Sequence, residues 1–257
     1  MIGQKQIQED INKLISKNKF PKFSMIVGSR GSGKKTLVTE LFPAVIKLED
    51  CTVDSIRKLI EMTYKLRDFV FLVADADNMS VTAQNAILKV AEECPNNNTI
   101  IMTLEDENNV LETIRSRAII FRMNRYTPDE IFEYYWTIGS MPNDAEIVKE
   151  LCETPGEVLM LDKAGIMSFY DYVQLVVDNI TEVSLANVFK VPSKISLKVD
   201  TEGYDLKLFW KAFQKICMEQ HPEWVLITSK YLRKLKVRVI NRQMLIDCWL
   251  LEIRKWT

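Results

Sequence analysis

Residues 28–36 read GSRGSGKKT, and this stretch decides the fold that the sequence predicts. A short apolar run at 23–27 precedes it, and a helical pattern at 34–42 follows it. In such a strand–loop–helix setting, glycines let backbone N–H groups face a phosphate, and the helix N-terminus adds a positive field. The ammonium of Lys34 is expected to reach the β and γ phosphates. The stretch therefore indicates a phosphate-binding loop.

The residue after Lys34 departs from the usual pattern. Serine or threonine stands there in a working loop, because its hydroxyl ligates magnesium, but this chain has Lys35. An ammonium repels Mg²⁺, although it can still hold phosphate as a point charge. Thr36 comes one position late, about 100° further round the helix, so its hydroxyl is not expected at the same site. We therefore expect poor magnesium-dependent hydrolysis.

The predicted nucleotide-binding residues share this loop and the helix turn after it: Gly28, Gly31, Gly33, Lys34, Lys35 and Thr36. The sequence leaves open whether ATP, ADP or another phosphate-like anion binds there, or no cofactor at all. It predicts no metal site. The five cysteines form no CxxC pair, so zinc is not expected. The single histidine, His221, leaves almost no room for a histidine metal site.

The first 123 residues alternate strand and helix patterns. Short apolar strands are expected at 23–27, 45–48, 69–73, 99–104 and 118–123, with helices between them. Apolar strands that alternate with helices are typical of a parallel sheet covered on both faces. Ser80 is the expected N-cap of the helix that reaches Glu93. The sequence therefore predicts a doubly wound α/β domain in this part of the chain.

Helical patterns dominate after Arg125. Thr127, Pro128 and the acids that follow are typical of a helix start. We divide the chain into an α/β domain at 1–123, a helical lid at 124–166 and an all-α domain at 167–257. Segment 187–206 is the expected linker or loop. In the last part Trp210, Trp224, Trp249 and Trp256 are expected in a core or an oligomerisation interface.

Composition and charge exclude several classes of protein. Apolar residues make up 47% of the 257 residues, which is enough for ordinary globular cores. Thirty-four basic and 35 acidic residues give a formal charge of -1, which argues against binding nucleic acid by overall charge. The first ten residues, MIGQKQIQED, lack the apolar core of a signal peptide, and no apolar run approaches ~20 residues. We expect a soluble, cytoplasmic protein without a membrane partner.

A resemblance to a known family rests on several further stretches. These are Gly3-Gln4, the VDSIR segment at 53–57, the ADNMS segment at 76–80 that leads into AQNAILK at 83–89, the EECP segment at 92–95, and the IRSRA segment at 114–118. Their order and spacing resemble bacterial AAA+ clamp-loader subunits over about residues 3–123. The rest of the chain matches loosely, in its three-domain layout and in residues 241–247. The zinc module of many gamma and delta-prime subunits is absent, since only Cys51 lies in that interval.

The resemblance implies a damaged hydrolytic site. ATP-hydrolysing relatives end the third strand in Asp-Glu, and by alignment Ala74 and Asp75 stand in those places. Asp75 would then be a degenerate remnant of the acid pair, although Asp75 and Asp77 could instead be surface acids that lead a helix. Thr103 occupies the γ-phosphate-sensing position, where threonine is compatible with sensing and also ordinary in a strand. Leu159 replaces the sensor arginine of the lid.

The IRSRA segment implies that Arg117 is an arginine finger, acting on ATP held by a neighbouring subunit. An arginine that fixes the end of the last strand through a salt bridge is the alternative. The resemblance as a whole implies a delta-prime-like subunit that helps to load a sliding clamp onto primer-template DNA, together with other loader subunits, and has no ATPase activity of its own. A working ATPase subunit and a stand-alone DNA-binding or regulatory AAA+ module remain the alternatives.

A basic group near the C-terminus has two interpretations. Its members are Lys230, Arg233, Lys234, Lys236, Arg238 and Arg242. Such a group could contact DNA phosphates. A solvated helix face or an inter-subunit surface of salt bridges is the interpretation that we favour.

Overall fold

The computed structural model describes residues 3–48, 50–138, 144–182, 195, 205–235 and 241–256. The backbone forms two compact units, Met1–Glu130 and Ile131–Thr257. The finer division at 123 and 166 stays a prediction. Most of the expected linker at 187–206 lies outside the described residues, as do Lys236 and Arg238 of the basic group. No helix in the described part of the chain is long and apolar enough to cross a membrane.

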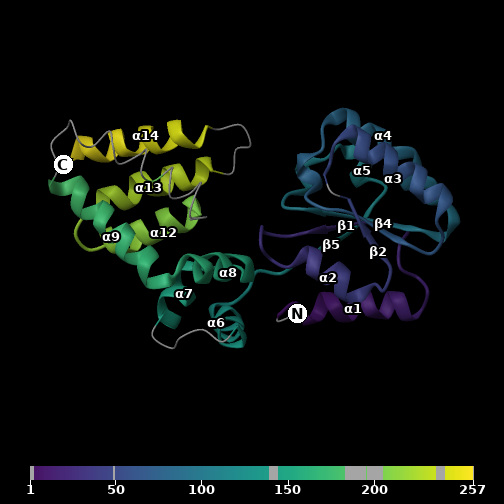
Figure 1. Ribbon diagram of the computed structural model, residues 1–257, viewed down its shortest axis with the longest axis horizontal. Coiled ribbons are helices and arrows are strands. Elements are labelled where there is room, and N and C mark those ends of the chain that lie inside the picture. Colours follow the sequence, from purple (N-terminus) through teal and green to yellow (C-terminus); the bar gives the residue numbers. More distant parts are fainter. Residues whose placement is uncertain are drawn as a thin grey trace. The chain divides into compact units, whose positions relative to one another are not determined.

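The first unit contains a five-stranded parallel sheet (Figure 1). Its strands are β1 (Phe23–Val27), β2 (Val45–Lys47), β3 (Val70–Val73), β4 (Thr99–Leu104) and β5 (Ile119–Arg122). Their order is β2-β3-β4-β1-β5, so β1 lies between β4 and β5. Since all the strands run the same way, the segments that follow β1, β3 and β4 meet at one edge of the sheet. This is the carboxyl edge, and the opposite one is the amino edge.

Helices cover both faces of the sheet, which confirms the predicted α/β class (Figure 1). Helices α1 (Lys5–Ser16) and α2 (Lys34–Leu41) lie on one face, and α3 (Val53–Lys65) and α4 (Val81–Glu93) lie on the other. Single-turn helix α5 (Glu112–Arg115) precedes β5, and 3-10 turns occupy Ala76–Asn78, Pro95–Asn97 and Glu107–Asn109. Each interior strand therefore has two buried faces.

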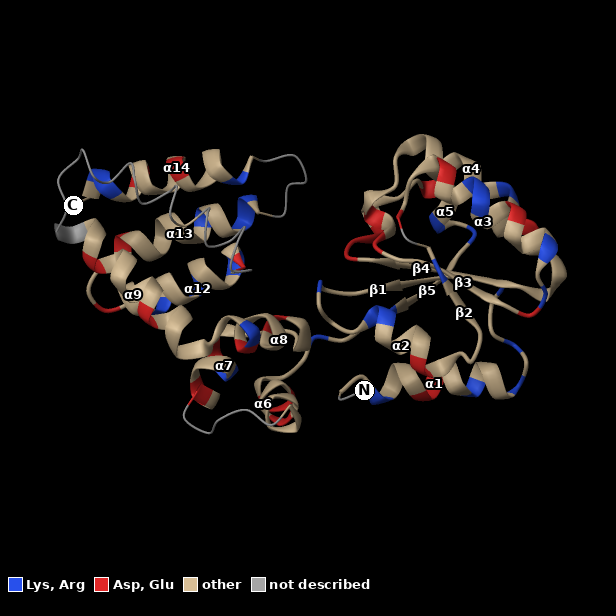
Figure 2. Cartoon of the chain, in the orientation of Figure 1, with Lys and Arg blue, Asp and Glu red and all other residues tan. Residues whose placement is uncertain are grey.

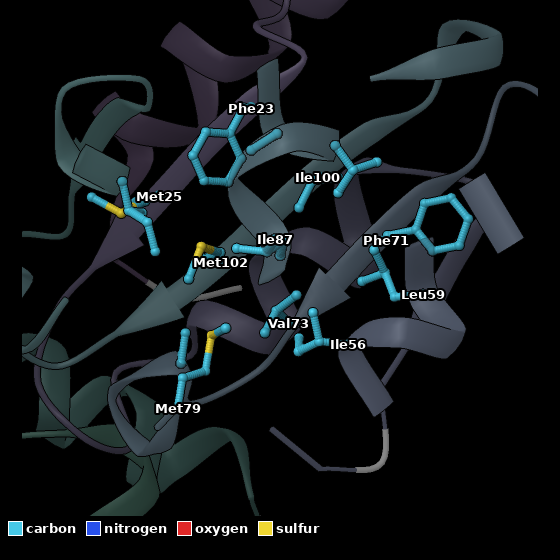
Figure 3. Close-up of a cluster of buried hydrophobic side chains, with 14 of the residues drawn as sticks. Phe23, Met25, Ile56, Leu59, Phe71, Val73, Met79, Ile87, Ile100 and Met102 are labelled. Atoms are coloured by element: carbon cyan, nitrogen blue, oxygen red, sulfur yellow. The ribbon is translucent and has the colours of Figure 1, made fainter. Parts of the chain in front are cut away.

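Alternate residues of the strands point into two separate cores. Met25, Phe71 and Val73 pack with Ile56 and Leu59 of α3 and with Ile87 of α4 (Figure 3). Ile26, Leu72 and Ile101 pack on the other face with side chains of α1 and α2. This period of two follows from the pleat of a strand. It explains why the strands read as continuous apolar runs in the sequence.

Polar side chains cap α3, α4 and α6, and the caps at Ser80 and Thr127 were expected from the sequence. The Ser80 hydroxyl accepts a hydrogen bond from the Ala83 N–H at 3.2 Å and caps α4. Thr52 caps α3 in the same way, accepting from the Ser55 N–H at 3.3 Å. At α6 (Pro128–Thr137) the Thr127 hydroxyl accepts from the Glu130 N–H at 3.2 Å. These caps fix where each helix begins.

The second unit is helical throughout its described residues. Besides most of α6 it contains α7 (Ala145–Leu151), α8 (Pro155–Ala164), α9 (Ile166–Glu182), α12 (Leu206–Cys217), α13 (Pro222–Lys234), α14 (Arg242–Ile253) and a 3-10 turn at Arg254–Trp256. Trp210, Trp224 and Trp249 are fully buried, as predicted for a core. Trp256 is 66% exposed, so it is not a core residue.

Candidate functional site

The predicted phosphate loop lies between β1 and α2, at the carboxyl edge of the sheet. The Gly28 N–H donates to the Leu104 carbonyl at 3.0 Å, which ties the loop to the end of β4. Gly31 and Gly33 have φ angles of 77° and 88°, a left-handed region that favours glycine. A Cβ on Gly28 would lie 3.0 Å from the Cβ of Met123. The loop therefore has the backbone that its glycines predicted.

Lys34 is turned inward and is only 6% exposed. Its ammonium donates to the carbonyls of Gly28 at 2.6 Å and Ser29 at 2.8 Å. Burial lowers the pKa of Lys34, and the carboxylates of Glu105 and Asp75 partly oppose that effect. Lys34 therefore stabilises the loop itself, and its ammonium lies where the loop could present it to a phosphate.

Two residues that the sequence analysis missed hold the loop from the β5 side. The Tyr126 hydroxyl donates to the Ser32 carbonyl at 2.8 Å. The Ser32 hydroxyl lies 3.5 Å from the sulfur of Met123. Because Val27 pairs with Arg122, the residues after β5 lie beside the loop. Nothing in the local sequence around Tyr126 and Met123 indicates that they contact the loop. Only the pairing register of β5 with β1 could have revealed these contacts.

Lys35 forms an ion pair with Asp75. Its Nζ lies 2.5 Å from Oδ2 of Asp75, and the two side chains are 42% and 51% exposed. The first turn of α2 is basic, because it begins with Lys34 and Lys35 (Figure 2). Thr36 is exposed at the next helix position. The structure thus places a lysine ammonium against the carboxylate that remains at the end of β3.

Asp75 is held in a left-handed conformation, with φ 54°. Its N–H donates to the hydroxyl of Thr103 at 3.1 Å, and Thr103 is fully buried on β4. Ala74 offers no side-chain ligand, and its carbonyl accepts from the thiol of Cys51 at 3.1 Å. Burial raises the pKa of that thiol to about 11, so it stays protonated at neutral pH. The backbone of Asp75, which follows β3, is thus joined to the hydroxyl of Thr103 on β4.

Asp77 is buried, so the interpretation of this residue as a surface acid was wrong. Asp77 is only 7% exposed. It accepts hydrogen bonds from the N–H groups of Glu105 at 2.7 Å and Asp106 at 3.3 Å, and from the Asn109 amide at 3.0 Å. Asp77 therefore orders the loop after β4 and is a structural residue.

The residues at the end of β3 and the start of α2 do not fit a magnesium ion. Mg²⁺ prefers oxygen ligands at about 2.0–2.1 Å in an octahedral arrangement. Lys35 offers an ammonium and no oxygen, the Ala74 side chain has no ligand atom, and Asp75 is already paired with an ammonium. Among the residues that the structure describes, no group of three or more His, Cys, Asp or Glu side chains could hold a metal ion.

Arg117 lies at the amino edge of the sheet, just before β5. Ile119 pairs with Ser24 near the start of β1, and Arg122 pairs with Val27 at its end. This paired span separates Arg117 from the phosphate loop by at least about 10 Å, at ~3.3 Å per strand residue. The Arg117 Nε is ion-paired with the carboxylate of Glu92 on α4, and its Nη1 donates to the Thr113 carbonyl at 2.9 Å. Arg117 and the loop therefore lie at opposite edges.

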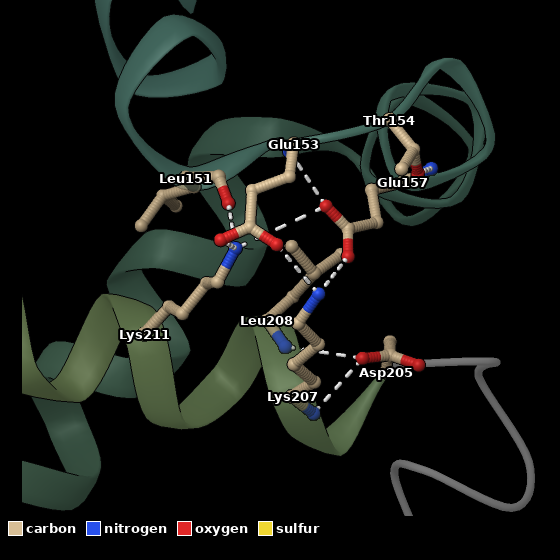
Figure 4. Close-up of polar contacts among 8 residues, drawn as sticks. All are labelled: Leu151, Glu153, Thr154, Glu157, Asp205, Lys207, Leu208 and Lys211. Atoms are coloured by element: carbon tan, nitrogen blue, oxygen red, sulfur yellow. Dashed lines mark hydrogen bonds and ion pairs between the residues drawn. The ribbon is translucent and has the colours of Figure 1, made fainter. Parts of the chain in front are cut away.

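The segment that resembles the lid sensor belongs to the second unit. Glu157, in the first turn of α8, is buried and accepts from the ammonium of Lys207 at 2.7 Å (Figure 4). Glu153 pairs with Lys207 at 2.9 Å and with Lys211 at 3.0 Å. These ion pairs join the start of α8 to α12. Leu159 lies further along α8 and is 47% exposed, so it offers an apolar surface where relatives carry arginine.

Two described members of the basic group near the C-terminus, Lys230 and Lys234, contact residues of α13 and α14. Lys230 pairs with Glu252 at 2.7 Å. The Lys234 ammonium lies 4.6 Å from the centre of the Tyr231 ring. Lys230 and Lys234 therefore contact residues of this chain, and an inter-subunit surface of salt bridges stays a prediction.

Comparison with known proteins finds similarity to subunits of clamp loaders. The family model described as DNA polymerase III, delta subunit, matches residues 44–127. DNA polymerase III subunit gamma of Buchnera aphidicola subsp. Schizaphis graminum is 27% identical, with 52% of this chain and 47% of that protein covered. Replication factor C subunit 5 of Schizosaccharomyces pombe is 26% identical, with 49% and 48% covered. Over these parts of its length the chain is similar to AAA+ clamp-loader subunits.

Solved structures of similar fold cover most of the chain. A DNA polymerase III gamma subunit-related protein of Thermotoga maritima has a TM-score of 0.55 at 17% identity, with 96% of this chain and 98% of that chain covered. The RuvB Holliday junction branch migration motor of the same organism has a TM-score of 0.54 at 18% identity, with 86% and 78% covered. The chain spans about half the length of the curated relatives it matches.

Proposed function

We propose that this chain is a delta-prime-like clamp-loader subunit, which supplies Arg117 in trans to ATP bound by a neighbouring subunit and does not hydrolyse ATP itself. The observation that carries the proposal is the separation of Arg117 from the phosphate loop by the depth of the sheet. An arginine at the amino edge cannot serve the loop at the carboxyl edge of the same chain. It is exposed enough, at 38%, to contact another subunit.

The phosphate loop itself supports the second half of the proposal. Any bound phosphate would contact the backbone of Gly31 and Gly33 and the ammonium of Lys34, so the loop can supply positive charge. Hydrolysis also needs a metal and a carboxylate that orients water. Lys35 opposes the metal, and its ion pair with Asp75 engages the remaining carboxylate. The loop would therefore act as a structural element or hold a nucleotide unchanged.

The partners follow from the same proposal. They are the other clamp-loader subunits, the sliding clamp and primer-template DNA in the cytoplasm. A pulldown from the native host with mass spectrometry should recover loader subunits and the clamp. If the protein ran as a monomer and recovered neither, a stand-alone DNA-binding or regulatory AAA+ module would be the better assignment.

The decisive test measures ATP turnover in two settings. The isolated chain should show no Mg-ATP turnover, whereas a working ATPase subunit would show turnover that Lys34→Ala abolishes. In a loader reconstituted from the host's own subunits, adding this chain should raise ATP turnover, and Arg117→Ala should remove most of that stimulation, since arginine fingers contribute about 10³–10⁵ in rate at their own site. Arg67→Ala is the matched control, because Arg67 is an exposed arginine just before β3, at the same edge.

A further inference from the structure

Arg117 is held by two neighbouring helices. Its Nε–H faces the carboxylate of Glu92, the next-to-last residue of α4, and its Nη1 donates to the carbonyl of Thr113 in α5. These two contacts engage two of the five N–H donors of a guanidinium. The Arg117 and Glu92 side chains remain 38% and 49% exposed. The pair therefore lies at the surface, with part of the guanidinium accessible to another molecule.

The two helices differ in how firmly they are anchored. Helix α5 is a single turn of four residues, whereas α4 has 13 residues and spans about 20 Å at 1.5 Å per residue. Helix α4 buries Ala83, Ile87 and Val90 against the sheet. Glu92 is thus fixed to the core of the first unit, while Arg117 follows a short turn. Glu92 therefore extends from a long helix packed on the sheet, whereas Arg117 follows a single turn whose Ile114 is buried in the same core.

We propose that Glu92 is a positioning residue for Arg117: it holds the guanidinium in one orientation before the neighbouring subunit's ATP reaches it. This inference rests on the proposed trans role of Arg117. A free arginine side chain samples many rotamers, and a charge-assisted hydrogen bond from a packed helix removes most of them in advance. The remaining donors then meet a phosphoryl group in a defined geometry, which matters because a small misplacement costs a large factor in rate.

The test compares Glu92→Ala with Glu93→Ala in the reconstituted loader. Glu93 is the neighbouring exposed acid of α4, and its carboxylate accepts a hydrogen bond from the Tyr64 hydroxyl at 3.0 Å. Glu92→Ala should lower the kcat of the stimulated ATP turnover roughly 10-fold or more with the KM for ATP unchanged. Glu93→Ala should leave both unchanged. Glu92→Gln, which keeps an acceptor but not the charge, should fall between Glu92→Ala and the unsubstituted chain.

A double variant separates positioning from a structural role. Glu92→Ala should have no further effect on turnover in an Arg117→Ala background, and the melting temperatures of both Glu92 variants should stay close to that of the unsubstituted chain. The proposal is overturned if Glu92→Ala leaves turnover unchanged while Arg117→Ala lowers it. It is equally overturned if Glu92→Ala raises turnover, because the carboxylate would then sequester the arginine. If Arg117→Ala itself has no effect, the trans role fails and this inference fails with it.

Discussion

The ammonium of Lys35 lies 2.5 Å from Oδ2 of Asp75, so the first turn of α2 is joined directly to the segment after β3. In a working phosphate loop, a hydroxyl and an acid at corresponding places approach each other through a magnesium ion. Here a fixed side-chain cation meets the carboxylate without a metal. This ion pair, the hydrogen bonds to Asp77, the ion pairs of Glu153 and the buried indole of Trp249 each lead to a prediction.

Replacing Lys35 with threonine and Ala74 with aspartate should make ADP binding depend on magnesium. The pair of changes restores a hydroxyl and an acid and removes the competing ammonium. ADP at about a hundred times the Kd that the double variant has in MgCl₂ should raise its free energy of unfolding by about 2–3 kcal/mol. Removing Mg²⁺ should abolish most of this gain. Unfolding in ADP with either MgCl₂ or EDTA measures this. The single variant Ala74→Asp is the control, since Lys35 remains. A magnesium-dependent gain in the unsubstituted chain would contradict the prediction.

Asp77→Ala should destabilise the first unit by about 2–3 kcal/mol, because it leaves the Glu105 and Asp106 N–H groups and the Asn109 amide without their acceptor. Asp75→Ala is the matched control. It breaks only an exposed ion pair and should cost less than about 1 kcal/mol. Urea unfolding followed by circular dichroism compares the two variants. Equal losses of unfolding free energy in the two variants would mean that the burial of Asp77 does not set the cost of replacing it.

Acid should weaken the second unit through Glu153. Burial tends to raise the pKa of this carboxyl, but hydrogen bonds from Lys207 and Lys211 outweigh it and lower the pKa to about 2. A lowered folded-state pKa means that the stabilisation is present above the unfolded value of 4.5 and is lost as pH falls from there towards 2. Since the Glu153 side chain is 64% exposed, the loss should stay below about 1 kcal/mol. Glu153→Gln should remove this part of the pH dependence.

Tryptophan fluorescence can follow that titration, because all five tryptophans lie between Trp136 and Trp256, in the second unit. Urea unfolding at pH 7 and at pH 3 should show a smaller difference for Glu153→Gln than for the unsubstituted chain. An equal difference in both proteins would assign the acid sensitivity to other groups.

Trp249→Phe should destabilise the second unit by roughly 1–3 kcal/mol. The indole is fully buried, and its N–H donates to the Thr228 hydroxyl at 2.9 Å. The smaller ring leaves a cavity and removes that hydrogen bond. Trp256→Phe, at an exposed position, should change the stability by no more than about 0.5 kcal/mol. Guanidinium unfolding of the two variants measures the difference, and comparable losses would show that burial does not set the cost.

Much of the first unit could be predicted from local patterns. Apolar runs located the five strands, and Ser80 marked the start of α4. The predicted strands exceed β2 and β3 by one residue each and β5 by one residue at each end, since pairing with neighbours decides where a strand ends. The burial of Asp77 was not predictable, because its partners lie 28 to 32 residues away in the loop after β4. Tyr126 was missed for the same reason, since only the register of β5 on β1 brings it beside the loop.

The sequence by itself determined the α/β class, the phosphate loop in outline and the replacement of a magnesium ligand by Lys35. Those features depend on residue types and on short spacings along the chain. The period of a strand and the backbone freedom of glycine turn such local patterns into structure. Only the tertiary structure decided which charges meet: Lys35 with Asp75, Arg117 with Glu92, and Glu153 with Lys207. Such pairs join segments distant in the chain, and their contact depends on strand order and helix packing, which no local pattern contains.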